Sequence, residues 1–151
     1  MAGRFALAIL IVIVASRRAV LRTFLLPGLI VMPFVFGWAA VHSLTWLQIG
    51  MFVAGFLTVA QFSFWGNYLP HAFPVHLRGT GESFAANIGG RLIGTCFAGI
   101  TQWIALKLPF SDMQPAEKTA YAAAGVALLV YAVNFVVSFW LPEPKSEDLS
   151  E

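Results

Sequence analysis

The chain has 151 residues, of which 59% are hydrophobic and only 11% charged, and its mean hydropathy is +0.79. A soluble domain carries about 25% charged residues, so the composition excludes an ordinary water-soluble domain and favours a membrane protein. The formal net charge is +2, and the basic residues fall in short clusters between apolar runs. Nucleic-acid binding would need a basic face, so we do not expect it.

The first apolar run, residues 5–15, is too short to cross a bilayer as a helix, which takes roughly 20 residues. It fits the apolar core of a signal peptide after Arg4, or the end of a longer span whose beginning is missing. Arg17, Arg18 and Arg22 follow at once and oppose export of the next segment. We therefore favour the truncated span.

Four longer apolar runs follow in the chain: residues 23–41, 44–69, 83–108 and 119–141. Pro27 and Pro33 should kink the first of these, which is tolerable where neighbouring helices satisfy the freed carbonyls. The sequence thus predicts an all-α integral membrane protein. It has three to four full transmembrane helices plus one short N-terminal apolar helix in residues 1–141, and a tail at 142–151.

Lysine and arginine in short loops predict the orientation. The segment after the first run holds three arginines, the loop "HSLT" holds none, and the next loop holds Arg78. This alternation places the arginine-rich segment, the Arg78 loop and the C-terminus in the cytoplasm. Tryptophan and tyrosine near the span ends support the topology and say nothing of function.

The loop around Arg78 interrupts the apolar sequence most sharply. Pro70 and Pro74 are expected to end the preceding helix. Gly79 and Gly81 allow backbone angles that other residues avoid, and Thr80 can cap the next helix. The sequence predicts a tight, cationic cytoplasmic turn between two spans.

The stretch "LPHAFPVHLRGTGESFAANIGGRLIG" resembles the turn between the tenth and eleventh helices of major facilitator superfamily transporters. It departs from that motif at His71, where the family has Glu, and at His76, where it often has Arg. The tail "WLPEPKSEDL" is similar to the family's sequence after helix twelve. The matching residues of the turn are Pro70, Phe73, Pro74, Arg78, Gly79, Thr80, Gly81, Phe84, Asn87, Gly90 and Arg91.

The resemblance implies a segment of a secondary active transporter, covering a truncated helix eight and helices nine to twelve. Such a protein moves a small metabolite, an organic acid or sugar, by alternating access with proton coupling. Its partners would be the lipid bilayer of the bacterial inner membrane, the missing N-terminal part or partner half, and the substrate. The alternative is a small complete polytopic membrane protein with a structural or assembly role and no transport activity.

Arg91 is the one charge well inside an apolar run. A charge in lipid is costly and is a functional candidate by default, but a long side chain can also snorkel to the headgroups. We keep both interpretations: a snorkelling or structurally paired residue, and a cytoplasmic gate residue that pairs with an acid in one transport state. Arg78 is an orientation anchor, and the resemblance adds a role in the gating turn with Gly79, Thr80 and Gly81.

Two further groups of residues, small ones and uncharged polar ones, are candidates for contacts between helices. Ala86, Gly90 and Gly94 recur every four residues, a spacing that allows close helix packing. Asn87 and Asn134 are candidates for lining a cavity, with helix–helix hydrogen bonding as the alternative for each. The single cysteine, Cys96, lies in an apolar run and is expected to be a small buried residue.

No catalytic or metal-binding constellation can be assembled from the sequence. His42, His71 and His76 have no cysteine or carboxylate at ligand spacing, and the acids lie in loops and the tail. We therefore predict no enzyme activity, no metal and no cofactor.

Overall fold

A computed structural model of the chain describes residues 16–110 and 112–141. Every regular element within those residues is helical, which confirms the predicted all-α class. The expected helix at 5–15 and the tail at 142–151 lie outside the described residues.

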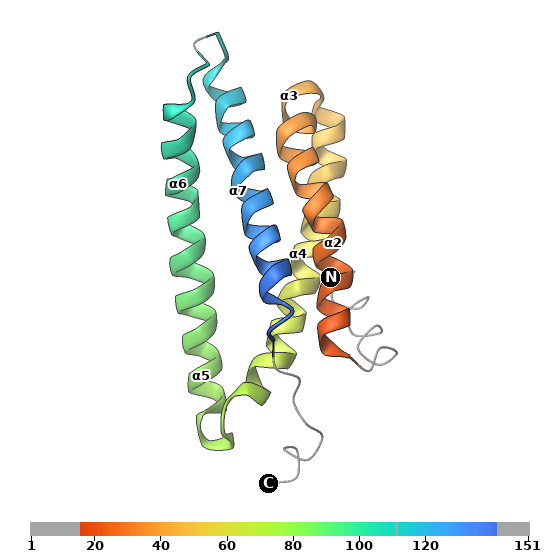
Figure 1. The fold of residues 1–151 in the computed structure, drawn as a ribbon, viewed down its shortest axis with the longest axis vertical. Coiled ribbons are helices and arrows are strands. Elements are labelled where there is room, and N and C mark those ends of the chain that lie inside the picture. The colour runs from red at the N-terminus through yellow and green to blue at the C-terminus, as the bar shows by residue number, and fades with distance from the viewer. Residues whose placement is uncertain (1–15, 111, 142–151) are drawn as a thin grey trace.

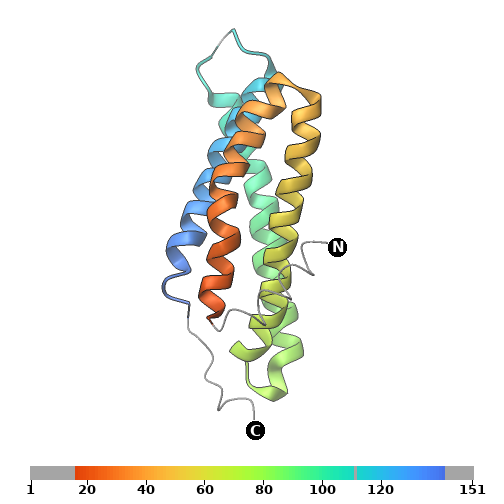
Figure 2. The ribbon, with the colours of Figure 1, turned by 90° about the vertical axis from the view of Figure 1, so that its right-hand side faces the viewer.

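The described helices form rods that run up and down side by side (Figures 1 and 2). Short turns separate the rods, and η2 is a single turn of 3-10 helix. In chain order the elements are α2 (Arg17–Phe34), the π-helical η1 (Val35–Ala39), α3 (Ala40–His42), α4 (Leu44–Ala72), η2 (Val75–Leu77), α5 (Arg78–Ala85), the π-helical η3 (Ala86–Ile93), α6 (Gly94–Lys107) and α7 (Pro115–Val137). We call α2, η1 and α3 the α2–α3 rod, and α5, η3 and α6 the α5–α6 rod.

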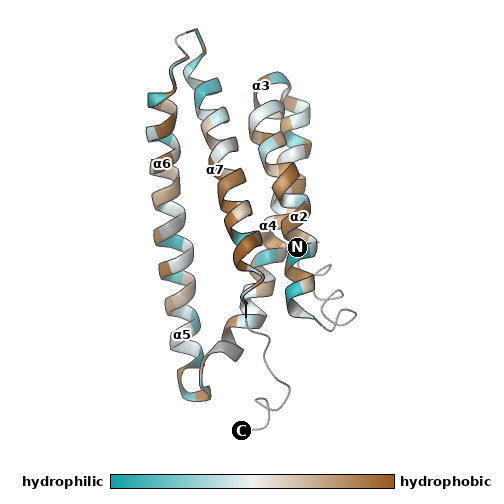
Figure 3. Ribbon diagram, viewed as in Figure 1, coloured by the Kyte–Doolittle hydropathy of each residue, from teal (hydrophilic) through white to brown (hydrophobic). Residues whose placement is uncertain are grey.

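Three of the described helices are long and apolar enough to cross a membrane: Arg18–His42, Leu44–Gly66 and Pro115–Val137. They correspond to three of the four predicted spans. The fourth, 83–108, falls in the α5–α6 rod, which is long but is not one of the three. Hydrophilic positions interrupt the apolar ones along that rod (Figure 3).

The α2–α3 rod stays helical through both of its prolines. Ser16 caps its start, where the side-chain oxygen accepts a hydrogen bond from the Ala19 amide at 3.3 Å. Pro27 and Pro33 lie inside α2, and the π-helical turn η1 begins two residues after Pro33. In η1 the backbone amide of Ala40 donates to the carbonyl of Val35, five residues earlier. Ser43 alone, in an extended conformation, separates this rod from α4.

The core lies between α2 and α4, and α7 packs on α2 from the other side. Buried side chains repeat on each helix at three- and four-residue spacing, as expected for two helices that each bury one face. The ring of Tyr131 and that of Phe135 bring α7 onto this cluster. The buried cluster consists of Val20, Leu21, Phe24, Leu25, Leu57, Ala60, Phe64 and Tyr68.

The α5–α6 rod lies at the edge of the bundle, where α6 packs chiefly on α7. Many large apolar side chains point outward from the bundle; Leu106 is 85% exposed and Phe52 is 73% exposed. In water such a surface would be unfavourable, so it fits a bilayer. Cys96 of α6 is exposed, and the expectation that it is buried was wrong, because its side of α6 meets no other helix of the described chain.

Candidate functional site: the basic turn and a polar seam

The turn between α4 and α5 is tight but differs from the prediction in its details. Helix α4 continues past Pro70 to Ala72, so Pro70 does not end it. Phe73 is extended and Pro74 follows, as expected for a residue that precedes proline. Helix α5 already begins at Arg78, so Thr80 lies inside it and is not its cap.

The two glycines of this turn do not supply unusual backbone angles, since no residue in the described ranges has a positive φ. Gly81 has a different role. A Cβ atom at position 81 would lie 2.6 Å from Cδ1 and 2.7 Å from Cγ of Phe73, whereas one at Gly79 would meet nothing within 4 Å. Gly81 therefore lets the Phe73 ring lie against α5 and close the turn.

Arg78 begins α5 and is half-buried. Its Nε atom is buried and has no hydrogen-bond partner within the described residues. The turn lies at the same end of the bundle as the start of α2, with Arg18 and Arg22, and as the end of α7 (Figure 1). The predicted basic loops thus share one end, and the side of the membrane that this end faces stays a prediction.

The predicted residues of the α5–α6 rod lie on its open surface. Asn87 is exposed, and its Nδ2 donates a hydrogen bond to the Ser83 carbonyl of its own helix at 2.8 Å. Arg91 is exposed as well and lies in the π-helical segment η3, a form that often marks functional positions. Their roles in a cavity and a gate stay predictions.

The predicted packing face of this rod has no helix against it in the described chain. Ala86, Gly90 and Gly94 are exposed, and a Cβ at either glycine would meet nothing within 4 Å. The face carries only small, exposed residues at these positions, which is compatible with close packing of a further helix. Contact with another helix at this face stays a prediction.

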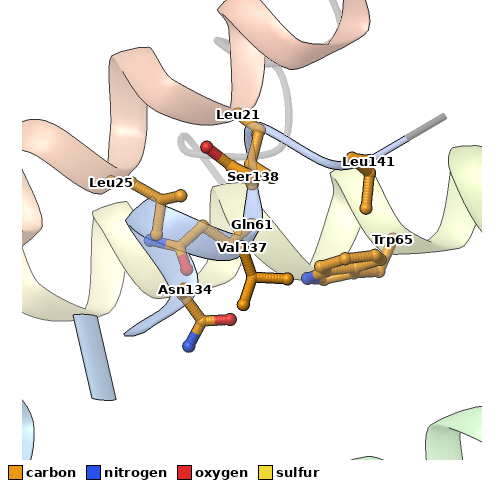
Figure 4. Close-up of a pocket in the computed structure, with 8 residues that line it drawn as sticks. All are labelled: Leu21, Leu25, Gln61, Trp65, Asn134, Val137, Ser138 and Leu141. Atoms are coloured by element: carbon orange, nitrogen blue, oxygen red, sulfur yellow. The ribbon is translucent and has the colours of Figure 1, made fainter. Parts of the chain in front are cut away.

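Asn134 lines a small cavity between α2, α4 and α7 (Figure 4). Its side chain also donates to the Val130 carbonyl at 2.9 Å. The volume of the cavity is about 20 Å³. Its walls combine apolar side chains with an amide or hydroxyl from two of the helices: Leu21, Leu25, Gln61, Trp65, Asn134, Val137, Ser138 and Leu141.

Two hydrogen-bonded contacts flank this cavity. At one end Arg22 of α2 donates from Nε to the Ser138 hydroxyl at 3.2 Å and from Nη2 to the Ser138 carbonyl at 3.4 Å. The Arg22 guanidinium also lies 3.9 Å from the Phe139 ring centroid. At the other end Gln61 of α4 donates to the Tyr131 hydroxyl at 3.4 Å. We call Arg22, Gln61, Tyr131, Asn134 and Ser138 the polar seam.

Sequence reasoning picked out only part of the seam. Asn134 is a candidate from the sequence, Arg22 falls in a predicted basic segment, and Ser138 is not among the candidates. A signal was present: Tyr131, Asn134 and Ser138 follow an i, i+3, i+7 spacing, which places them on one face of a helix. Ser138 is 1% exposed, which gives its hydroxyl a structural role that its position near the chain's end did not suggest.

No protein-family model, no characterised protein and no solved structure matches this chain. The resemblance of the Phe73–Gly81 turn to major facilitator transporters therefore stays a prediction. The described residues form a helical bundle with three apolar helices of membrane-spanning length, a tight basic turn and a polar seam.

Proposed function

We propose that the chain is a segment of a secondary active transporter of the major facilitator type. The complete protein moves a small organic acid or sugar across the bacterial inner membrane by alternating access, coupled to protons. The observation that carries the proposal is the turn at 73–81, whose sequence resembles the family motif. The tight fit of the Phe73 ring over Gly81 supports a specific structural use of that motif.

Transporters of this type have two six-helix halves, with the substrate site between them near the membrane midplane. The open face of the α5–α6 rod supports such an arrangement, since Ala86, Gly90 and Gly94 offer a smooth surface for further helices. Arg91, exposed on the same rod, is our candidate for a gate residue that pairs with an acid of the missing part. The turn with Arg78, Gly79, Thr80 and Gly81 couples this rod to α4.

Proton coupling needs a titratable group near the midplane. The three apolar helices contain no aspartate or glutamate between their ends, apart from Glu117 in the first turn of α7. The coupling acid therefore belongs to the missing N-terminal part or to a partner half, and this chain alone does not transport. Asn134 is the residue of this chain that we propose lines the substrate cavity of the complete transporter.

One observation favours the alternative, a small complete membrane protein with a structural or assembly role. Helices α2 and α4 share a buried cluster within this chain alone, with Phe64 and Val20 fully buried, and Tyr131 and Phe135 of α7 pack against it. A self-contained bundle can exist without a transport partner. The two proposals differ in whether further spans belong to the same functional unit.

The test begins with the DNA on both sides of the coding sequence. Seven or more further spans, in frame, across a frameshift or in an adjacent gene, are expected from the transporter proposal. The product with those spans is then reconstituted in vesicles with an imposed pH gradient, and uptake of labelled organic acids and sugars is measured against Arg91→Gln. Absence of such spans, or uptake that does not respond to the gradient, contradicts the proposal and leaves the structural role.

A further inference from the structure

The polar seam crosses an otherwise apolar helix interface. Tyr131 of α7 and Ser138 at its C-terminal end face α4 and α2, as the bonds to Gln61 and Arg22 show. Asn134 lies between them in the chain and is exposed, at the rim of the cavity. The two bonded contacts lie at residues 131 and 138 of α7, a separation of roughly 10 Å along a helix. Between them is the cavity, with Asn134 on its wall (Figure 4).

The size of the cavity matches one small molecule. Its volume is about 20 Å³. A site for one water needs a cavity volume of about 10–15 Å³ and two to four polar partners. Gln61, Asn134 and Ser138 supply three polar residues on the wall.

The hydrogen bonds in place leave each of these three polar side chains with unused bonding capacity. Gln61 uses one amide hydrogen for Tyr131, and Asn134 uses one for the Val130 carbonyl, so each amide retains an acceptor oxygen and a second hydrogen. The Ser138 hydroxyl donates to the Phe135 carbonyl at 2.6 Å and accepts from Arg22, which leaves one lone pair. In a bilayer such groups need a partner.

We propose that the cavity binds a single water molecule that bridges Gln61 of α4, Asn134 of α7 and Ser138, the residue that follows α7. The water joins the Arg22–Ser138 contact to the Gln61–Tyr131 contact in one hydrogen-bonded chain. It thereby ties the three helices together along a polar line that starts at the basic end of the bundle. This site does not depend on the proposed transport activity.

The test uses the full chain in lipid bilayers, labelled with ¹⁵N in its asparagine and glutamine side chains. Solid-state NMR measures magnetisation transfer from water to each side-chain amide. We expect transfer to both Gln61 and Asn134. Gln61→Leu should reduce the transfer to Asn134 several-fold, and Asn134→Leu should do the same at Gln61.

Gln48→Leu is the matched control, because Gln48 is exposed near the other end of α4 and lies outside the cavity. It should leave the transfer to Asn134 unchanged. The proposal is overturned if the wild-type chain shows no transfer to either amide, which needs no variant to fold. It is also overturned if transfer to Asn134 is unchanged in a folded Gln61→Leu chain, since the water that reaches Asn134 would then not be held by Gln61.

Discussion

Replacing Gly81 by alanine tests the closed turn most directly. The new Cβ would lie 2.6 to 2.9 Å from three ring carbons of Phe73, whereas carbon atoms in contact prefer about 3.5–4.0 Å. The ring must therefore move by roughly 1 Å, and overpacking of this kind costs about 1–3 kcal/mol. Gly79→Ala is the control, since its Cβ meets nothing within 4 Å.

Both substitutions replace glycine inside α5, and alanine there favours the helix by at most about 1 kcal/mol. Both variants share this gain, so it cancels when their stabilities are compared. Gly81→Ala should therefore be less stable than Gly79→Ala by about 1–3 kcal/mol. The free energy of unfolding is measured in bicelles by titration with dodecyl sulfate, followed by circular dichroism. When Phe73→Leu is added to each alanine variant, most of the difference in stability between them should disappear, because the ring carbons are gone. Equal stability of the two alanine variants would refute the closed turn.

The contacts of Arg22 and the orientation of the bundle in the membrane give two further predictions. Arg22→Met should lower the free energy of unfolding by about 1–2 kcal/mol, because two bonds to Ser138 and a cation–π contact are lost. Arg22→Lys should recover less than half of that loss, since lysine lacks the planar fork, and full recovery would contradict the proposed geometry. In a Cys96→Ala background, a membrane-impermeant maleimide should label Phe110→Cys on intact cells and Val75→Cys only after permeabilisation. The reverse labelling would place the basic turn outside.

The membrane helices were predictable because each depends on its own run of residues. A segment of sufficient length and hydropathy crosses a bilayer whatever it packs against, and 23–41, 44–69 and 119–141 were all recovered. The turn was predictable only in part. Pro74 and its extended neighbour marked the helix end correctly, but a single proline near the end of a helix costs one hydrogen bond, and α4 continues past Pro70.

The polar seam could not be predicted in full, because its bonds join distant positions. Arg22 and Ser138 are 116 residues apart, and Gln61 and Tyr131 are 70 apart. No local periodicity reports which faces of two helices meet. The spacing of Tyr131, Asn134 and Ser138 indicated a shared face on α7 and left its partners undefined.

We predict that Arg91 opposes insertion of the α5–α6 rod into the membrane. It lies thirteen residues after Arg78, roughly 20 Å along the helix, and it is exposed. A charge at the bilayer centre costs about 2.5–3.5 kcal/mol on insertion scales, so Arg91→Leu should favour insertion by about 2–3 kcal/mol. A glycosylation acceptor in the loop at 108–114 of the full chain, translated into microsomes, reports whether this rod crosses. Arg78→Leu, at the end of the rod, should change the glycosylated fraction little. If the two variants change it equally, the Arg91 charge already reaches the headgroups, and its position offers no reason to expect a paired acid.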